Sequence, residues 1–281
     1  MPEFASLDSY LHFQQSVRWK TRYAYDDETK DFLKTVIETS APRVRRMKKG
    51  QILFRAQRGY RWSPEGGGAF EVETAFDPER MLPKAELVGE GRVNPSKIPC
   101  LYLATNRNTA MAEVRPCLGS RISLAEFKVM RDCLLVDCSL DKKRSLDFML
   151  FKVNARKKRP EPDAATKETA VWGDIAHAFS EPVSADEPHS DYIATQILSE
   201  TFRGHGYHGI VYKSLLDDRG RNVALFDVTS AELINCGLYQ TRSVSFQFDQ
   251  EDNPYFIAKH YPEPLEGKGG DDDEQEPPVT A

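Results

Sequence analysis

The sequence predicts an α+β fold with mixed or antiparallel sheets, short helices and a helical extension at the N-terminus. Short apolar or alternating segments, typical of strands, are interleaved irregularly with a few segments of helical period. The regular strand–helix alternation of a doubly wound sheet is missing. No strand leads through a Gly-x-Gly-x-x-Gly turn into a helix, so we expect neither a Rossmann site nor a P-loop.

The composition is that of a globular protein with one large or two small domains. The 281 residues are 40% hydrophobic and 29% charged, and the formal net charge is −5, so the overall field does not favour nucleic acid. The sequence has no 18-residue apolar run and no apolar signal segment, which predicts a cytoplasmic protein without direct nucleic-acid or membrane contacts. Five cysteines without a Cys-x-x-Cys pair indicate reduced thiols and no metal site.

Residues 1–45 are expected to form the helical extension. Apolar residues recur at helical spacing from Phe4 to Phe13 and from Phe32 to Ile37, which predicts two helices. Pro42 ends the second helix. The basic run at 43–49 is interpreted as a solvated charged edge of the domain that follows.

The main domain is expected to cover residues 46–262. Apolar and alternating segments predict strands at 51–55, 99–104, 121–129, 133–138, 209–213 and 222–227, and helices at 109–114, 146–153, 171–179 and 191–202. Residues 56–90 show no period and are interpreted as an irregular lid or wall of a site. We further expect an excursion at about 141–190, a hairpin of 238–248 with 255–260, and a disordered acidic tail at 263–281.

The stretch from Gly91 to Pro116 organises the predicted site. It joins a glycine–arginine turn, a short apolar strand and the start of a helix capped by an asparagine. Arg92, Tyr102 and Glu113 lie at the joints between these pieces. A unit that brings a cation, an aromatic ring and a carboxylate to one mouth suits a phosphorylated ligand.

Six short motifs, in order along the chain, resemble those of the RES domain family, which is named after an arginine, a glutamate and a serine. They are Phe54-Arg55, Gly91-Arg92-x-Asn94, Ile98-Pro-x-Leu-Tyr-Leu-Ala104, Thr109-Ala-x-Ala-Glu113, Gly209-Ile-x-Tyr-x-Ser214 and Asn222-x-x-Leu-Phe226. Each motif is weak alone, and their shared order makes the resemblance specific. Two positions depart from the usual pattern: Val93 stands where members commonly have tryptophan, and Lys97 where they commonly have glycine.

The resemblance implies an ADP-ribosyltransferase-like core and an enzyme that consumes NAD. Known members are toxins of bacterial toxin–antitoxin pairs, so the expected reaction is cleavage of the nicotinamide–ribose bond by phosphate or by water. NAD is then the substrate, phosphate is an optional co-substrate, and no cofactor is expected. A helix-turn-helix antitoxin is the implied partner, and homo-oligomer formation stays open. Two alternatives also stay open, namely ADP-ribosyl transfer to a protein and a module that binds NAD or a partner without chemistry.

The expected catalytic residues are Glu113, Arg55 and Ser214. Departure of nicotinamide leaves a positively charged sugar, which the carboxylate of Glu113 would stabilise, unless it is a solvated helical side chain. Arg55 and Arg92 would hold the phosphates, with structural ion pairs as the alternative. Ser214 would donate to a ribose hydroxyl or a phosphate, and it has no nucleophile-elbow motif or triad partners. We expect the arginines and Glu113 to converge on one dinucleotide-sized hollow.

Three further residues are assigned to NAD binding. Tyr102 points to the opposite side of its strand from the neighbouring leucines, and its ring would stack on nicotinamide or belong to the core. Asn222 would bind substrate or hold a loop through its amide. Asn94 belongs to the glycine–arginine–x–asparagine motif and completes the expected set.

Overall fold

The computed structural model describes residues 2–64, 70–140, 145–157, 162–181 and 192–245. In chain order, its helices and strands are α1 (Ser9–Trp19), α2 (Asp27–Glu38), β1 (Val44–Met47), β2 (Ile52–Arg58), β3 (Arg61–Pro64), β4 (Glu71–Thr74), α3 (Pro78–Met81), β5 (Leu101–Ala104), α4 (Arg107–Glu113), β6 (Arg121–Val129), β7 (Cys133–Asp137), α5 (Ser145–Arg156), α6 (Ala164–Ser180), α7 (Ile193–Gly204), β8 (Gly209–Lys213), β9 (Arg221–Leu225) and β10 (Ala231–Gln240). Short 3-10 turns cover Ala41–Arg43 and Val228–Ser230.

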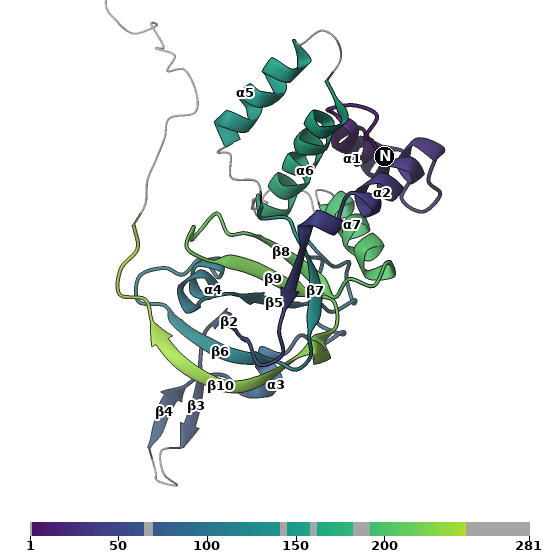
Figure 1. The fold of residues 1–281 in the computed structure, drawn as a ribbon. Helices are drawn as coiled ribbons and strands as arrows, with labels where there is room; N and C mark the ends of the chain where they lie inside the picture. The colour runs from purple at the N-terminus through teal and green to yellow at the C-terminus, as the bar shows by residue number, and fades with distance from the viewer. Residues whose placement is uncertain (1, 65–69, 141–144, 158–161, 182–191, 246–281) are drawn as a thin grey trace, which may run out of the picture. The chain divides into compact units, whose positions relative to one another are not determined.

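The larger sheet has eight strands in the order β1-β7-β8-β9-β5-β2-β6-β10 (Figure 1). The β7–β8 pair is parallel, and the other neighbouring strands are antiparallel. Strands β3 and β4 form a separate two-stranded sheet. The predicted α+β class with a mostly antiparallel sheet is confirmed. No helix in the described ranges is both long and apolar enough to cross a membrane.

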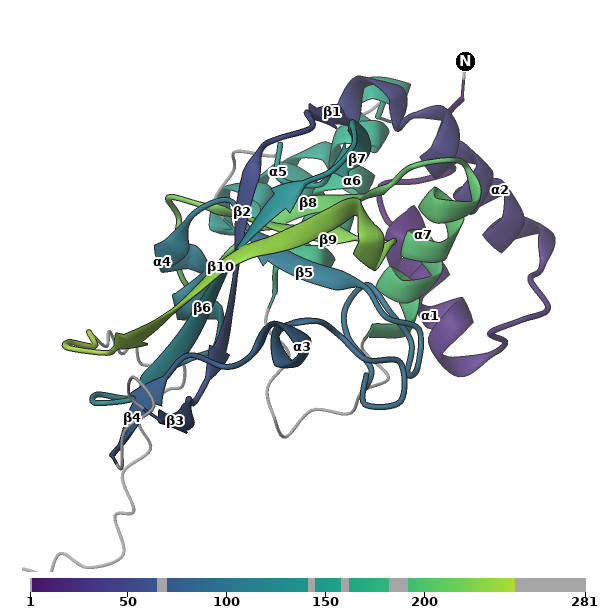
Figure 2. The ribbon, with the colours of Figure 1, turned by 90° about the horizontal axis from the view of Figure 1, so that it is seen from below.

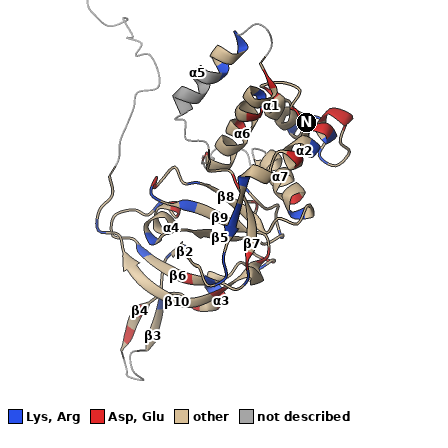
Figure 3. Ribbon diagram, viewed as in Figure 1, with Lys and Arg blue, Asp and Glu red and all other residues tan. Residues whose placement is uncertain are grey.

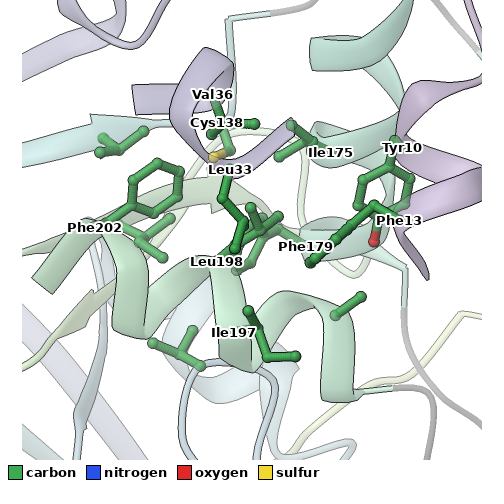
Figure 4. Packing of buried hydrophobic residues seen from close by; sticks show 14 of the residues in the cluster. Tyr10, Phe13, Leu33, Val36, Cys138, Ile175, Phe179, Ile197, Leu198 and Phe202 are labelled. Atoms are coloured by element: carbon green, nitrogen blue, oxygen red, sulfur yellow. The ribbon is translucent and has the colours of Figure 1, made fainter. Parts of the chain in front are cut away.

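Helices α1, α2, α6 and α7 pack together on one face of the sheet (Figure 2). Their buried side chains share one cluster with residues of β7, β8 and β9, and Figure 4 shows Phe13, Phe179 and Phe202 within it. Burying a side chain of this size contributes roughly 1.5–3 kcal/mol. Within this cluster, the indole nitrogen of Trp172 on α6 donates to Oγ1 of Thr39 over 3.0 Å.

Two segments predicted from the sequence contribute side chains to this shared core. Residues 1–45 do form two helices, as expected, and these helices pack against α6 and α7. Helix α6 comes from the expected excursion, yet its residues Val171, Trp172 and Ile175 are fully buried. The proposed domain boundaries at residues 45 and 262 stay predictions, and Met1–Val244 form one compact unit.

The opposite face of the sheet encloses a second core. Each of the eight strands contributes at least one buried side chain to this cluster, and α3 adds Met81. The sequences of these strands are alternating or apolar because every second side chain faces this core. The predicted boundaries of β6 and β8 are therefore reproduced by the structure.

Three segments differ from the sequence prediction, two of them because short polar strands lack an apolar period. Residues 56–90 are not irregular throughout, since they contain the end of β2, the β3–β4 sheet and α3. The basic run at 43–49 contains β1, an edge strand paired with β7, and the ribbon of β1 is coloured blue in Figure 3 at its arginines. The last described strand, β10, begins at Ala231 and ends at Gln240, earlier than predicted. The expected partner at 255–260 and the tail at 263–281 lie outside the described residues.

Candidate active site between strands β2 and β5

The candidate site lies where strands β2 and β5 separate. They share a single ladder pair, Phe54 with Ala104, whereas β2 pairs with β6 over seven residue pairs. A cavity of about 210 Å³, here called the split cavity, opens between the two strands. Its walls include Arg55, Tyr102 and Glu113, together with the strand residues Tyr212 and Asn222.

Helix α4 brings Glu113 to the split cavity. Asn106 caps the helix, because its Oδ1 accepts from the backbone nitrogen of Thr109 over 2.8 Å. Oγ1 of Thr109 in turn donates to the buried Oδ2 of Asp217 over 2.8 Å. A Cβ atom on Gly220 would lie 1.9 Å from this hydroxyl, so only glycine allows the loop to approach α4 so closely. The helix is thereby fixed against the loop that follows β8.

Two neutral donors hold one oxygen of the Glu113 carboxylate. Its Oε1 accepts from Oγ of Ser214 over 2.6 Å and from Nδ2 of Asn222 over 2.7 Å. Oγ of Ser214 accepts from the backbone nitrogens of Leu216 and Asp217, each over 3.2 Å. A hydroxyl has one proton, so these acceptor bonds leave that proton for Glu113. No described residue bonds to Oε2 of Glu113, which is therefore the oxygen available to a ligand.

Arg55 lies on the β2 side of the split cavity. Its Nη1 donates over 3.5 Å to the backbone oxygen of Tyr102, and its buried Nε has no partner in the described part of the chain. Arg55 and Tyr102 also line a larger cavity of about 450 Å³, which adjoins the split cavity and has Arg80 in its wall. Burial lowers the pKa of the Arg55 guanidinium, and the charge of Arg80 lowers it further.

Arg92 lies on another side of Glu113. Its guanidinium sits over the ring of Tyr212 at 5.4 Å from the centroid, and Nη2 donates over 2.5 Å to the backbone oxygen of Glu181. Arg92 and Glu113 line a third cavity of about 300 Å³. Burial raises the pKa of Tyr212 to about 12, although the positive charge of Arg92 acts in the opposite direction. Arg55 and Arg92 thus line two cavities that both border Glu113, and their convergence on one NAD molecule stays a prediction.

Tyr102 and Asn94 hold the loop that carries Arg92. The Tyr102 hydroxyl donates to Oδ1 of Asn94 over 2.7 Å and accepts from the backbone nitrogen of Val93 over 3.0 Å. Nδ2 of Asn94 donates to the backbone oxygens of Gly89 and Pro95. Both side chains line the larger cavity, but their polar groups are used by the loop. Substrate contacts from Asn94 and Asn222 stay predictions, since the amide of Asn222 is likewise engaged with Glu113.

A model of the RES domain family matches residues 52–249. The chain belongs to the RES domain family. Arg55, Glu113 and Ser214, the residues on which the sequence resemblance rests, all lie within the matched range. A search of the curated proteins finds no significant match.

Among solved structures, the chain is similar to one chain of the crystal structure of the M. tuberculosis MbcT–MbcA toxin–antitoxin complex. The match has 13% sequence identity and a TM-score of 0.36, and it covers 74% of this chain and 92% of the other.

Sequence reasoning missed two residues that shape this RES-domain site. Tyr212 lies on β8, two positions before Ser214, which directly follows the strand. Strand alternation could have placed both side chains on one face. Gln196 on α7 donates from Nε2 to the backbone oxygens of Gly91 over 2.9 Å and Asn94 over 3.1 Å. No local pattern signals the role of Gln196, because its partners are about a hundred positions away. The described residues hold no group of histidine, cysteine or acidic side chains able to bind a metal.

Proposed function

We propose that this RES-domain protein is an enzyme that consumes NAD by breaking the bond between nicotinamide and ribose, and that it acts as the toxin of a toxin–antitoxin pair. Family membership and the reactions of the known members support the proposal. The observation that carries it is the state of Glu113, whose Oε1 is held by Ser214 and Asn222 while Oε2 is left for a ligand. A carboxylate fixed in this way beside arginine-lined cavities suits NAD, whose diphosphate is negatively charged and whose ribose becomes positively charged during the reaction.

In the proposed reaction, the bond from C1′ of ribose to the nicotinamide nitrogen breaks and both electrons leave with nicotinamide. The sugar is left as an oxocarbenium-like cation, to which phosphate or water adds. Glu113 stabilises this cation through Oε2 or holds a ribose hydroxyl. Ser214 and Asn222 act as positioning residues, because they orient the carboxylate before charge develops on the sugar.

The remaining groups of the site match other parts of NAD in this proposal. Arg55 binds the diphosphate through its buried guanidinium, whose Nε has no partner among the described residues. Phe54 and the ring of Tyr102 line the split cavity beside Glu113 and supply an apolar wall for the nicotinamide ring.

Incubation of the purified protein with NAD, with and without phosphate, tests this function. We expect release of free nicotinamide under at least one of the two conditions. The second product should be ADP-ribose if water is the acceptor, and ADP-ribose 1-phosphate if phosphate is the acceptor. Absence of nicotinamide under both conditions would refute the proposal. Label from radioactive NAD on protein, instead of on a small sugar phosphate, would favour ADP-ribosyl transfer. NAD binding without turnover would favour a binding module.

The toxin role has its own test in cells. Expression of the protein should stop bacterial growth, and expression of the Glu113→Gln variant at the same level should not. Glu232→Gln on β10 is a matched control and should remain toxic. A helix-turn-helix protein encoded beside the gene is the proposed antitoxin, and its co-expression should restore growth.

A further inference from the structure

The loop that carries Arg92 is held from outside by one side chain of helix α7. In this loop, residues 91–94 form a turn in which the backbone nitrogen of Gly91 donates to the backbone oxygen of Asn94 over 2.9 Å, and the reverse bond spans 3.3 Å. Gln196 donates from Nε2 to both of these oxygens, over 2.9 Å at Gly91 and 3.1 Å at Asn94. One amide group therefore bridges the two ends of the turn.

Two further contacts attach this loop to the helical layer. Val93 is 2% exposed and belongs to the buried cluster that the helices form on the sheet. Nη2 of Arg92 donates to the backbone oxygen of Glu181, which is the C-cap residue of α6. The loop is thus fastened to α6, to α7 and to the core that these helices share.

The N-terminal extension packs against the same two helices without reaching the site. The described residues that line the three cavities include none before Phe54. Helix α1 contacts α6 and α7, and α2 contacts α7. The ring of Phe13 on α1 stacks on that of Phe32 on α2, with 4.6 Å between the centroids. Phe13 and Leu198 of α7 lie in one buried cluster (Figure 4), which also contains Val93. Packing therefore runs without a break from the extension to the loop.

We propose that Gln196 is a positioning residue for Arg92, and that the N-terminal extension supports it by holding the helix from which Gln196 reaches the loop. Gln196 is not among the described residues that line the three cavities, so it acts on the loop and not on the substrate. This inference rests on the proposed function, in which Arg92 is one of the arginines beside Glu113 that receive the anionic part of NAD.

Hydrogen exchange of the loop tests this role without any substrate. Gln196→Met nearly keeps the length of the side chain and removes the donor. Loss of the bridge should speed exchange of the backbone amides of Gly91 and Asn94 about tenfold, as loss of about one net hydrogen bond does. Gln15→Met, at an exposed position of α1, is the matched control and should leave these rates within about twofold. Unchanged exchange in Gln196→Met would overturn the proposal.

Phe13→Leu tests the support from the extension. The change keeps an apolar side chain and removes the ring that stacks on Phe32. We expect exchange of the loop amides to become about threefold faster or more, while the amides of β6, in the second core, keep their rates. Tyr23→Leu, at a side chain of the extension that is 95% exposed, is the control and should change neither. Loop exchange at the wild-type rate, or equal acceleration in β6, would remove the extension from the proposal.

Kinetics separate positioning from a purely structural effect. If Gln196 acts through Arg92, Gln196→Met should lower kcat/KM for nicotinamide release about tenfold in the wild-type background and less than about twofold in the Arg92→Gln background. Equal losses in the two backgrounds would overturn an action through Arg92. If the protein releases no nicotinamide, the proposed function fails, and the exchange rates of Gly91 and Asn94 still decide whether Gln196 holds the loop.

Discussion

The hydroxyl of Ser214 donates to Oε1 of Glu113 over 2.6 Å, although the two residues are 101 positions apart in the chain. This contact joins the end of β8 to the end of α4 at the border of two cavities. Asn222 on β9 reaches the same oxygen. The serine thus meets the glutamate as a donor that orients it, which agrees with the absence of a hydrolase-type nucleophile motif.

Glu113→Gln should nearly abolish nicotinamide release. The change is almost isosteric and keeps an oxygen that can accept from Ser214 and Asn222, but it removes the negative charge that would stabilise the sugar cation. We expect kcat to fall by about 100-fold or more, as when a group that stabilises charge in the transition state is lost. The melting temperature should change little, and differential scanning fluorimetry would verify this. A variant with wild-type kcat would remove the assigned role.

Ser214→Ala and Asn222→Ala test whether the two donors act together. Each removes one hydrogen bond to Oε1 of Glu113, so each should lower kcat about tenfold and leave KM for NAD within about threefold. Because both act on one atom, the double variant should lose less than the product of the single effects. Steady-state kinetics of the three variants would test this. A double variant whose loss of kcat equals the product of the two single losses would show that the two residues act independently.

Local patterns carried most of the fold prediction. Alternation in 121–129 predicted β6 with its correct ends, because one face of that strand is buried in the second core. The helix that ends at Glu113 was predicted from an asparagine cap, and Oδ1 of Asn106 does accept from the backbone nitrogen of Thr109. Strands β1, β3 and β4 were missed because their side chains are mostly polar and exposed. These segments are strands mainly because they pair with a neighbouring strand, and a local sequence pattern does not show that pairing.

The site was less predictable because its geometry depends on contacts between distant segments. Motif order brought Arg55, Arg92, Glu113 and Ser214 into one hypothesis. Arg55, Arg92 and Glu113 line neighbouring cavities, and Ser214 donates to Glu113. No local pattern could show that the arginines lie on different sides of Glu113. That arrangement follows from the separation of β2 from β5 and from the loop held by Gln196.

Gly91→Ala should loosen the loop that carries Arg92. A Cβ atom there would lie 2.6 Å from both Oδ1 of Asn94 and the hydroxyl of Tyr102, which bond to each other. We expect the free energy of unfolding to fall by about 1–3 kcal/mol, as for an overpacked buried site. Gly89→Ala is the matched control, because a Cβ atom at Gly89 meets nothing within 4 Å. Urea denaturation of both variants would test the contrast, and equal stability would contradict this role for Gly91.

Acid should weaken the attachment of α4 to the loop after β8 through Asp217. Burial acts to raise the pKa of this carboxyl, but hydrogen bonds from Arg219 and Thr109 and the charge of Arg219 outweigh it and hold the pKa below its ordinary value. A pKa that is lower in the folded protein means that the stabilisation is complete above the unfolded pKa of about 4 and is lost as pH falls through the folded value. Urea denaturation at pH 7, 4 and 3 should therefore show a stability loss below about pH 4 that is smaller in Asp217→Asn. Asp218→Asn, one position along the same loop, should keep the wild-type pH dependence, and an identical acid profile for wild type and Asp217→Asn would show that Asp217 does not contribute.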